Sequence, residues 1–267
     1  MHASHWRLLR HGPADGPWNM AVDEAVSGAV GEGRVPPTLR LYSWSVPTVS
    51  LGLLQQMTGA VDLAACERLG IPVVRRPTGG RAVLHAEELT YSVAAPRQGS
   101  WRALSVSEAF GVVSRGLVLG LERLGIVAGV GDSGIGAADR KRVEACFLAR
   151  RMPAVLVDGR KLIGSAQRRF PQAVLQHGSI LLDFDAALHQ RIFPSWPRND
   201  PAGGVTSLTA LLGVLPPMAH LLEAFAAGWE EAVGSACLAG ALTAGEEAEA
   251  TRLARERYGA AGWTFQR

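Results

Sequence analysis

Cys146, Lys161 and His177 follow one another within residues 143–183, and side chains of these types are suited to handling an acyl group. Cys146 lies in the segment EACF, and Lys161 follows a predicted turn at Asp158 and Gly159. An ammonium group beside a thiol stabilises the thiolate, which is the nucleophilic form of cysteine. The spacing makes a pair of Cys146 and Lys161 possible, and an unreactive cysteine is the alternative.

The segment RRPTGGRAVLH, residues 75–85, is the second candidate for a binding site. Gly79 and Gly80 lack a Cβ, so their backbone N–H groups can approach a ligand closely. The nearby arginines add positive charge, which suits a carboxylate, a thioester carbonyl or a phosphate. An ordinary hairpin, two strands around a glycine turn with solvated arginines, is the alternative. His85 is either a polar wall of a pocket or a hydrogen-bonded core histidine, and His177 alone is more often structural.

The composition indicates a globular protein with a large core. The chain has 267 residues, of which 48% are hydrophobic and 19% charged, enough for one large domain or two small ones. The formal net charge of +3 is spread along the chain, which favours a small anionic ligand or an acidic partner protein over nucleic acid.

The cysteines and the apolar segments restrict the class of protein further. The three cysteines include no CxxC pair, which argues against a disulfide framework and a structural zinc site. Cys66 lies on a predicted helix and is interpreted as a buried structural thiol. The first residues form no secretory signal, and no apolar run is long enough to span a membrane. We therefore expect a cytoplasmic protein.

Local patterns predict strands and helices along the whole chain. Asp15 is expected to cap a helix that ends near Gly31, and Ser105 or Ser107 to cap a helix that ends at Gly125. Residues 129–145 form a glycine-rich polar segment, predicted to close over a site or to be a solvated corner. Strands are expected at residues 6–12, 38–44 with 48–53 as its partner, 71–76, a hairpin of 154–159 and 161–167, and 174–185; further helices are expected at 62–70, 217–232 and 245–265.

Taken in order, several segments resemble the biotin/lipoate transferase and ligase superfamily, most closely octanoyltransferases of the LipM type that act in lipoate assembly. The matching segments are GPADGPWNMAVDEAV, LRLYSWSVPTVSLGLLQ, RRPTGGRAVLHAEELTYSV, EACF, GRKLIGSAQRR, LQHGSILLD, VTSLTALLG and RYGAAGWTF. They extend over almost the full length of the chain. An ordered series of this kind indicates membership of the superfamily.

The resemblance implies an α/β (α+β) fold with a mixed, largely antiparallel sheet wrapped by helices, similar to the catalytic domain of biotin protein ligase. It implies one catalytic domain over residues 1–267, without an accessory C-terminal domain. Cys146 would take octanoyl from acyl carrier protein as a thioester and pass it to a lysine of a lipoyl domain or of a glycine-cleavage H-type carrier protein. Neither a cofactor nor a metal would be needed, and Lys161 would assist the thiol. The implied substrate-binding residues are Arg75, Arg76, Thr78, Gly79, Gly80, Arg81, His85, Gly164, Ser165, Ala166, His177 and Gly178.

Three alternatives remain open at this stage. A lipoate–protein ligase would use ATP and Mg²⁺ to form an acyl-adenylate, and an amidotransferase would move octanoyl or lipoyl groups between carrier proteins. A non-catalytic relative would only bind lipoyl domains or acyl groups. Ala86 stands where the family usually has aspartate, and Arg81 replaces the third glycine of the ligase loop. Both departures favour the transferase branch.

Overall fold

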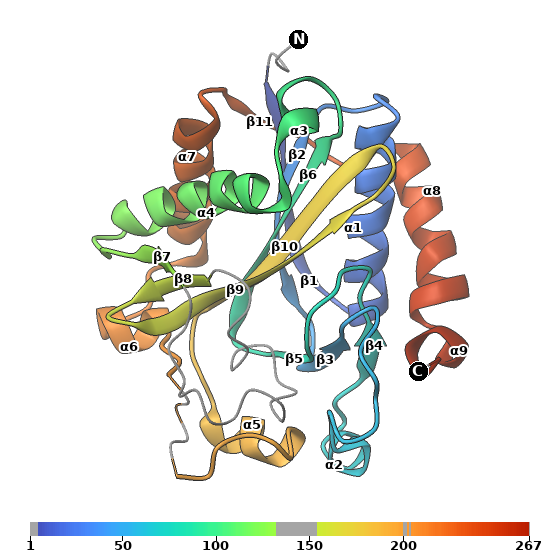
Figure 1. Cartoon of the computed structure of the whole chain (residues 1–267), viewed down its shortest axis with the longest axis vertical. Helices are drawn as coiled ribbons and strands as arrows, with labels where there is room; N and C mark the ends of the chain where they lie inside the picture. Colours follow the sequence, from blue (N-terminus) through green and yellow to red (C-terminus); the bar gives the residue numbers. More distant parts are fainter. Residues whose placement is uncertain (1–4, 132–153, 200–201, 203, 267) are drawn as a thin grey trace.

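The computed structural model describes residues 5–131, 154–199, 202 and 204–266. A large twisted sheet forms the middle layer, with helices on both of its faces (Figure 1). Its eight strands have the order β11-β1-β2-β6-β10-β9-β8-β7. The pairs β11–β1 and β1–β2 are parallel, and the other five pairs are antiparallel. The mixed, largely antiparallel sheet that was expected is therefore present.

The strands of the large sheet come from all parts of the chain. Their bounds are β1 (Trp6–Ala14), β2 (Thr38–Trp44), β6 (Glu88–Pro96), β7 (Gly129–Gly131), β8 (Ala154–Val157), β9 (Arg160–Arg169), β10 (Ala173–Leu181) and β11 (Cys237–Ala239). The predicted hairpin is confirmed, because β8 and β9 are joined at Asp158 and Gly159, both of which have positive φ.

A second sheet of three strands lies beside the large one, with the order β4-β3-β5. Its strands are β3 (Thr48–Leu51), β4 (Val73–Arg75) and β5 (Val83–His85). The predicted pairing of residues 48–53 with 38–44 is wrong, because β1 and β6 already occupy both edges of β2. Strands β4 and β5 lie on either side of the glycine segment, residues 76–82, in the sequence. They do not pair with each other, because each pairs with β3 instead.

Helices cover the two faces of the large sheet in pairs (Figure 1). Helices α1 (Gly16–Gly31) and α8 (Ala244–Leu253) lie against one face, and α4 (Val106–Glu122) and α7 (Met218–Val233) against the other. The remaining helical segments are α2 (Leu63–Arg68), α3 (Gly99–Ala103), α5 (Ala186–Ile192), α6 (Leu208–Leu212), the π-helical turn η3 (Ala254–Tyr258) and α9 (Ala261–Thr264).

The predicted helix caps are confirmed. Asp15 accepts a hydrogen bond from the backbone N–H of Trp18 at 2.8 Å, and Ser105 forms a reciprocal capping box with Glu108. Both caps depend on neighbours three residues apart, so the sequence alone determines them. The helix expected at the C-terminal end is α8, which continues as η3 before the chain turns at Gly259.

Each face of the large sheet has its own hydrophobic core. The core under α4 and α7 includes Leu41, Leu89, Tyr91 and Trp229. The core under α1 and α8 is smaller and includes Met20, Tyr42 and Trp44. Beside this smaller core, the central strands carry buried polar side chains, and these surround the site.

Candidate active site

A pocket with an empty volume of about 380 Å³ lies where the small sheet meets the α1 face of the large sheet. Seven of the residues predicted from the sequence as substrate-binding line it, namely Arg76, His85, Gly164, Ser165, Ala166, His177 and Gly178. The other lining residues are Met20, Tyr42, Val83, Thr90 and Ser179. The structure thus brings two separate predicted segments together in one place.

Three neighbouring strands supply a buried polar face beside this pocket. Side chains two residues apart on a strand point to the same face of the sheet, and here every second side chain is polar or aromatic. The set comprises Arg40, Tyr42 and Trp44 on β2, Glu88, Thr90 and Ser92 on β6, and His177 and Ser179 on β10. The alternate residues, such as Leu89 and Ile180, belong to the core on the opposite face.

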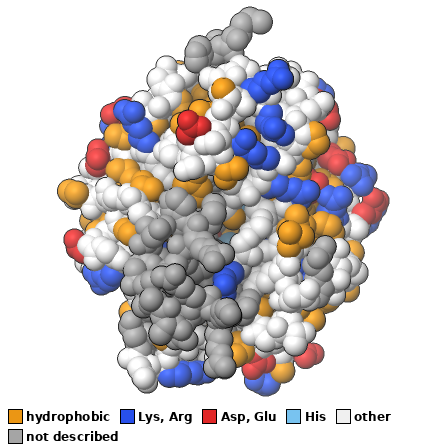
Figure 2. All heavy atoms as spheres, in the orientation of Figure 1, with side chains coloured by type: hydrophobic (Ala, Val, Ile, Leu, Met, Phe, Trp, Pro, Cys, Tyr) orange, Lys and Arg blue, Asp and Glu red, His pale blue; other side chains and the backbone are white. Residues whose placement is uncertain are grey.

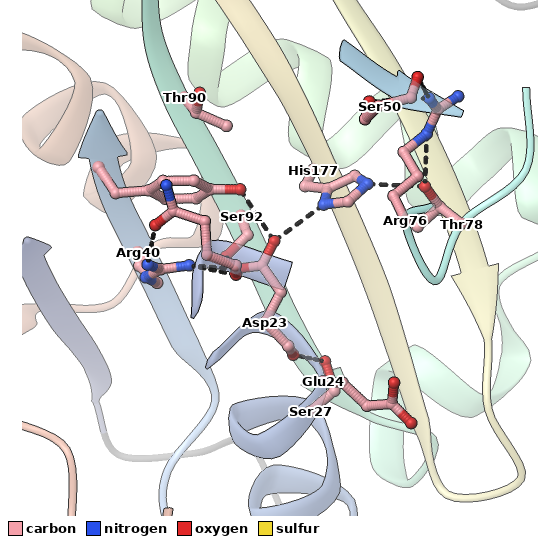
Figure 3. Close-up of polar contacts among 12 residues, drawn as sticks. Asp23, Glu24, Ser27, Arg40, Ser50, Arg76, Thr78, Thr90, Ser92 and His177 are labelled. Carbon is pink, nitrogen blue, oxygen red and sulfur yellow. Dashed lines mark hydrogen bonds and ion pairs between the residues drawn. The ribbon is translucent and has the colours of Figure 1, made fainter. Parts of the chain in front are cut away.

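Asp23 of α1 is the centre of the first polar cluster (Figure 3). Its carboxylate accepts bonds from Arg40 Nη1 at 2.7 Å, Ser92 Oγ at 2.8 Å and the Tyr42 hydroxyl at 3.0 Å. Burial alone would raise the pKa of Asp23, but the Arg40 guanidinium and the bonds from His177 and Ser92 outweigh it and lower the pKa. The carboxylate is therefore ionised and fully paired inside the protein.

His177 connects Asp23 to the glycine segment. Its Nδ1 lies 2.8 Å from Asp23 Oδ2, and its Nε2 lies 2.6 Å from Thr78 Oγ1 (Figure 3). Burial lowers the pKa of His177 more strongly than the Asp23 carboxylate raises it. The ring is consequently a neutral wall of the pocket at pH 7.

His85 is the centre of the second polar cluster. Its Nδ1 lies 2.9 Å from Glu88 Oε1, and its Nε2 lies 2.7 Å from Ser50 Oγ. The Trp44 ring stacks on the imidazole, with 4.0 Å between the ring centroids. Glu88 Oε1 also accepts bonds from Thr90 and from Trp44 Nε1. The sequence left open whether His85 is a pocket wall or a satisfied core histidine. The structure shows both features in one residue.

Arg75 and Arg76 have different surroundings. The Arg75 side chain is fully buried, and it donates to the carbonyl oxygens of Gly52 at 2.7 Å, Gln55 at 2.8 Å and Thr264 at 3.0 Å. It therefore fastens α9 and the segment after β3 to the small sheet, which is a structural role outside the pocket. Arg76 lines the pocket and holds the glycine segment from within.

The glycine segment curves around the Arg76 guanidinium. Arg76 Nη2 donates to the carbonyl oxygens of Gly79 at 2.6 Å and Arg81 at 2.8 Å. Gly80 has a φ of +89°, and a Cβ on Gly52 would lie 1.9 Å from the Gly80 carbonyl oxygen. Tight backbone contact and positive φ explain why glycine is required at these two positions.

Gly178 is required for a similar reason, on the β9 side of the pocket. A Cβ there would lie 2.3 Å from the Gly164 carbonyl oxygen and 2.8 Å from Ser165 Oγ. Ser165 accepts a bond from the Tyr91 hydroxyl at 2.6 Å, and burial raises the pKa of Tyr91 to about 12. The segments around Gly164 and Gly178 therefore form a close-packed, uncharged wall.

Lys161 lies at the start of β9 and is buried, with only 4% of its surface exposed. Its backbone is fixed between Gly204 and Thr206. Lys161 and Ser165 are four residues apart on β9, so their side chains point to the same face of the sheet, roughly 13 Å from each other. Cys146 and most of the glycine-rich segment 129–145 lie outside the described residues. The predicted pairing of Cys146 with Lys161 stays a prediction.

The described part of the chain lacks two kinds of feature. No group of three or more His, Cys, Asp or Glu side chains there has the arrangement of a metal site. No helix among those residues is both long and apolar enough to cross a membrane.

Sequence reasoning missed Asp23, Arg40, Ser50, Glu88 and Ser92. A usable signal was present for Glu88 and Ser92, because ELTYS alternates polar and apolar side chains with a period of two. That pattern normally indicates a strand with one face in water. In the structure, α1 and the small sheet cover the polar face, so these side chains are buried and must bond to one another.

Comparison with known proteins identifies similar chains. The family model for the lipoyl protein ligase A/B catalytic domain matches residues 15–230. An octanoyltransferase LipM from Symbiobacterium thermophilum is 42% identical, over 99% of both chains. An octanoyltransferase LipM from Geobacillus kaustophilus is 37% identical, over 98% of both chains.

Solved structures show the same fold at lower identity. A lipoate–protein ligase A bound with ATP superposes with a TM-score of 0.80 at 24% identity, covering 98% of both chains. Protein Ta0514 from T. acidophilum, a putative lipoate protein ligase with bound lipoic acid, gives a TM-score of 0.78 at 22% identity, covering 98% of this chain and 100% of that one. These two likenesses confirm the fold.

Proposed function

The chain belongs to the lipoyl protein ligase A/B catalytic-domain family, and from this premise we propose that it is an octanoyltransferase of lipoate assembly. Relatives that carry this name match nearly its entire length at 42% and 37% identity. The observation in the structure that carries the proposal is the pocket itself. Two predicted substrate-binding segments, far apart in the sequence, line one cavity beside the glycine segment.

The lining of the pocket suits an apolar acyl chain. Its walls combine apolar side chains, such as Met20 and Val83, with glycines and with the neutral ring of His177. Moving an apolar chain from water into such a pocket is favourable by roughly 25 cal/mol per Å² of buried surface. We propose that Gly164, Ser165, Ala166 and Gly178 contact the chain, while residues 76–81 and His85 surround its carbonyl end.

The proposed chemistry needs neither ATP nor a metal. The Cys146 thiolate attacks the carbonyl carbon of an octanoyl thioester on acyl carrier protein, a new C–S bond forms, and the carrier thiolate leaves and takes up a proton. A lysine amine of the lipoyl domain then attacks the acyl-cysteine, so that an amide forms and the Cys146 thiolate is released. Lys161, as ammonium, would stabilise the thiolate and, once neutral, would accept the proton of the amine.

The proposed partners are acyl carrier protein as donor and a lipoyl domain, or a glycine-cleavage H-type carrier protein, as acceptor. Both carriers are expected to be acidic. On the face shown in Figure 2, Lys and Arg side chains gather over α3 and the β9–β10 hairpin, the hairpin that also contributes to the pocket. Opposite charges steer association of two proteins. We also propose that residues 1–267 act as one catalytic domain, since β11 pairs with β1 and α8 packs on α1.

The fold is shared with lipoate–protein ligases, so the test must separate the two activities. The protein is incubated with an apo lipoyl domain and octanoyl-acyl carrier protein without ATP, and in parallel with free octanoate or lipoate, ATP and Mg²⁺. We expect modification of the lipoyl domain lysine in the first mixture only. Modification only in the second mixture would replace the transferase proposal with the ligase alternative.

A further inference from the structure

Two hydrogen-bond chains start from the Arg76 guanidinium, and both end at buried carboxylates. In the first chain, Arg76 Nε donates to Thr78 Oγ1 at 3.1 Å, and Thr78 Oγ1 lies 2.6 Å from His177 Nε2. The opposite nitrogen of His177 meets Asp23 at 2.8 Å. Figure 3 shows Arg76, Thr78, His177 and Asp23 in this order, from the small sheet to α1.

The second chain repeats this arrangement with different residues. Arg76 Nη1 donates to Ser50 Oγ at 3.1 Å, and Ser50 Oγ lies 2.7 Å from His85 Nε2. The opposite nitrogen of His85 meets Glu88 Oε1 at 2.9 Å. The order guanidinium, hydroxyl, imidazole, carboxylate is therefore the same in both chains. Arg76 belongs to both, and each of the other six residues belongs to one chain only.

The direction of each hydrogen bond follows from the groups at the two ends. A guanidinium can only donate, so each hydroxyl oxygen accepts from Arg76 and keeps its own hydrogen for the histidine. An ionised carboxylate can only accept, so His177 Nδ1 must carry a proton toward Asp23. Glu88 Oε1 also accepts from the donor-only Trp44 N–H, so His85 Nδ1 must likewise be the donor.

We propose that Arg76 is a positioning residue that fixes both pocket histidines, His85 and His177, as neutral Nδ1–H tautomers. The Ser50 hydroxyl directs its hydrogen at His85 Nε2, and the Thr78 hydroxyl directs its hydrogen at His177 Nε2. The positive charge of Arg76 also lowers the pKa of His177. No single pairwise contact produces this result. It needs the donor-only group between the two chains and the acceptor groups at their ends.

Histidines held in this form have fewer possible roles in acyl transfer, a consequence that rests on the proposed function. Each Nε2 already accepts a hydrogen bond, so neither ring can take a proton from an attacking amine without losing its partner. The histidines are then uncharged walls that hold the glycine segment in place, and the proton acceptor must be another group. An imidazolium at either position would place a charge beside an apolar chain, which is unfavourable.

The charged groups around the histidines agree with this assignment. His177 is faced by Asp23 from α1, by Arg76 and by His85, and Arg40 from β2 neutralises Asp23. Burial lowers the pKa of His177 despite the neighbouring carboxylate. His85 is faced by Glu88 from β6 and is covered by the Trp44 ring from β2.

The test is ¹⁵N NMR of the full chain labelled at histidine, since long-range couplings in the ring distinguish the two tautomers. His177→Gln and His85→Gln assign the signals. We expect both rings to show a protonated Nδ1 and an unprotonated, pyridine-type Nε2 at pH 7. A protonated Nε2 on either ring, as the other tautomer or as imidazolium, would overturn the proposal.

Matched variants test the part played by Arg76. Thr78→Val should change the Nε2 signal of His177 only, and Ser50→Ala that of His85 only, whereas Arg76→Lys should change both. Thr78→Ser keeps the hydroxyl and should keep the wild-type His177 signal. Ser114→Ala removes a buried hydroxyl on α4 and should leave both histidine signals unchanged. If the two histidines keep their signals in the variants that fold, Arg76 has no positioning role. These spectra need no substrate, so they fail or succeed independently of the proposed activity.

Discussion

The α1 face and the α4–α7 face of the central sheet are built by the same strands, yet they differ in kind. Along β6, Leu89 and Tyr91 enter a large apolar core, while Glu88, Thr90 and Ser92 point to a buried polar network. The apolar face is stabilised by many interchangeable contacts, and the polar face by specific pairs that each need their partner. Strand alternation thus separates the apolar core from the polar network within single strands.

This difference predicts that the polar face tolerates substitutions less well than the apolar face. Asp23→Ala would leave the fully buried Arg40 guanidinium without its carboxylate. Removing one partner of a buried ion pair costs about 3–5 kcal/mol, because the other charge stays uncompensated. We expect a loss of about 4 kcal/mol in the free energy of unfolding, measured by urea denaturation. A loss below about 1 kcal/mol would show that Arg40 finds another partner and that the network is redundant.

Leu89→Ala is the matched change on the apolar face, one residue from Glu88 along the same strand. Leu89 is 1% exposed, so the substitution leaves a cavity and should cost about 3 kcal/mol, within the usual range for buried leucines. Because the α1 face is untouched, we expect the folded fraction to keep its rate of octanoyl transfer. A selective loss of transfer rate in this variant would contradict the separation of scaffold and site.

A smaller effect should appear as pH dependence at His189 on α5. Burial lowers the pKa of His189 to about 4, against 6.5 in the unfolded chain. The unfolded state therefore binds the proton first as pH falls, and stability decreases from about pH 6.5 down to about pH 4. We expect a loss of about 2 kcal/mol between pH 8 and pH 5, from the linkage of one such group.

His189→Gln is the control for that measurement, because it removes the titrating group and keeps a polar side chain. Its unfolding free energy should fall less steeply between pH 8 and pH 5 than that of the wild type. Equal slopes for the two proteins would mean that the pKa of His189 is the same in the folded and the unfolded state. The unfolding curves in urea at each pH supply both values.

The features that sequence predicted well are local or family-wide. The cap at Asp15 and the turn at Asp158 depend on a few adjacent residues, so their patterns were sufficient. The resemblance correctly indicated the family, the fold and an octanoyltransferase of lipoate assembly, as relatives at 42% identity confirm. It also indicated the two segments that meet at the pocket.

What sequence did not predict depends on which strands and side chains meet. The predicted pairing of β3 with β2 was wrong, because β1 and β6 lie on either side of β2 and only the assembled sheet shows this. His177 was recognised, but its partner Asp23 lies 154 residues away, and no spacing rule connects them. Nothing in the strand pattern indicates that α1 and the small sheet bury Glu88 and Arg40.

The central claim, transfer through an acyl-cysteine, is tested most directly by the intact mass of the protein. Wild type and Cys146→Ala are each mixed with octanoyl-acyl carrier protein in the absence of ATP and then measured by mass spectrometry. We predict an octanoyl adduct on the wild type that hydroxylamine removes and that the variant lacks. An equal adduct on Cys146→Ala, or no adduct on a wild-type protein that modifies lipoyl domains only with ATP, would contradict the account.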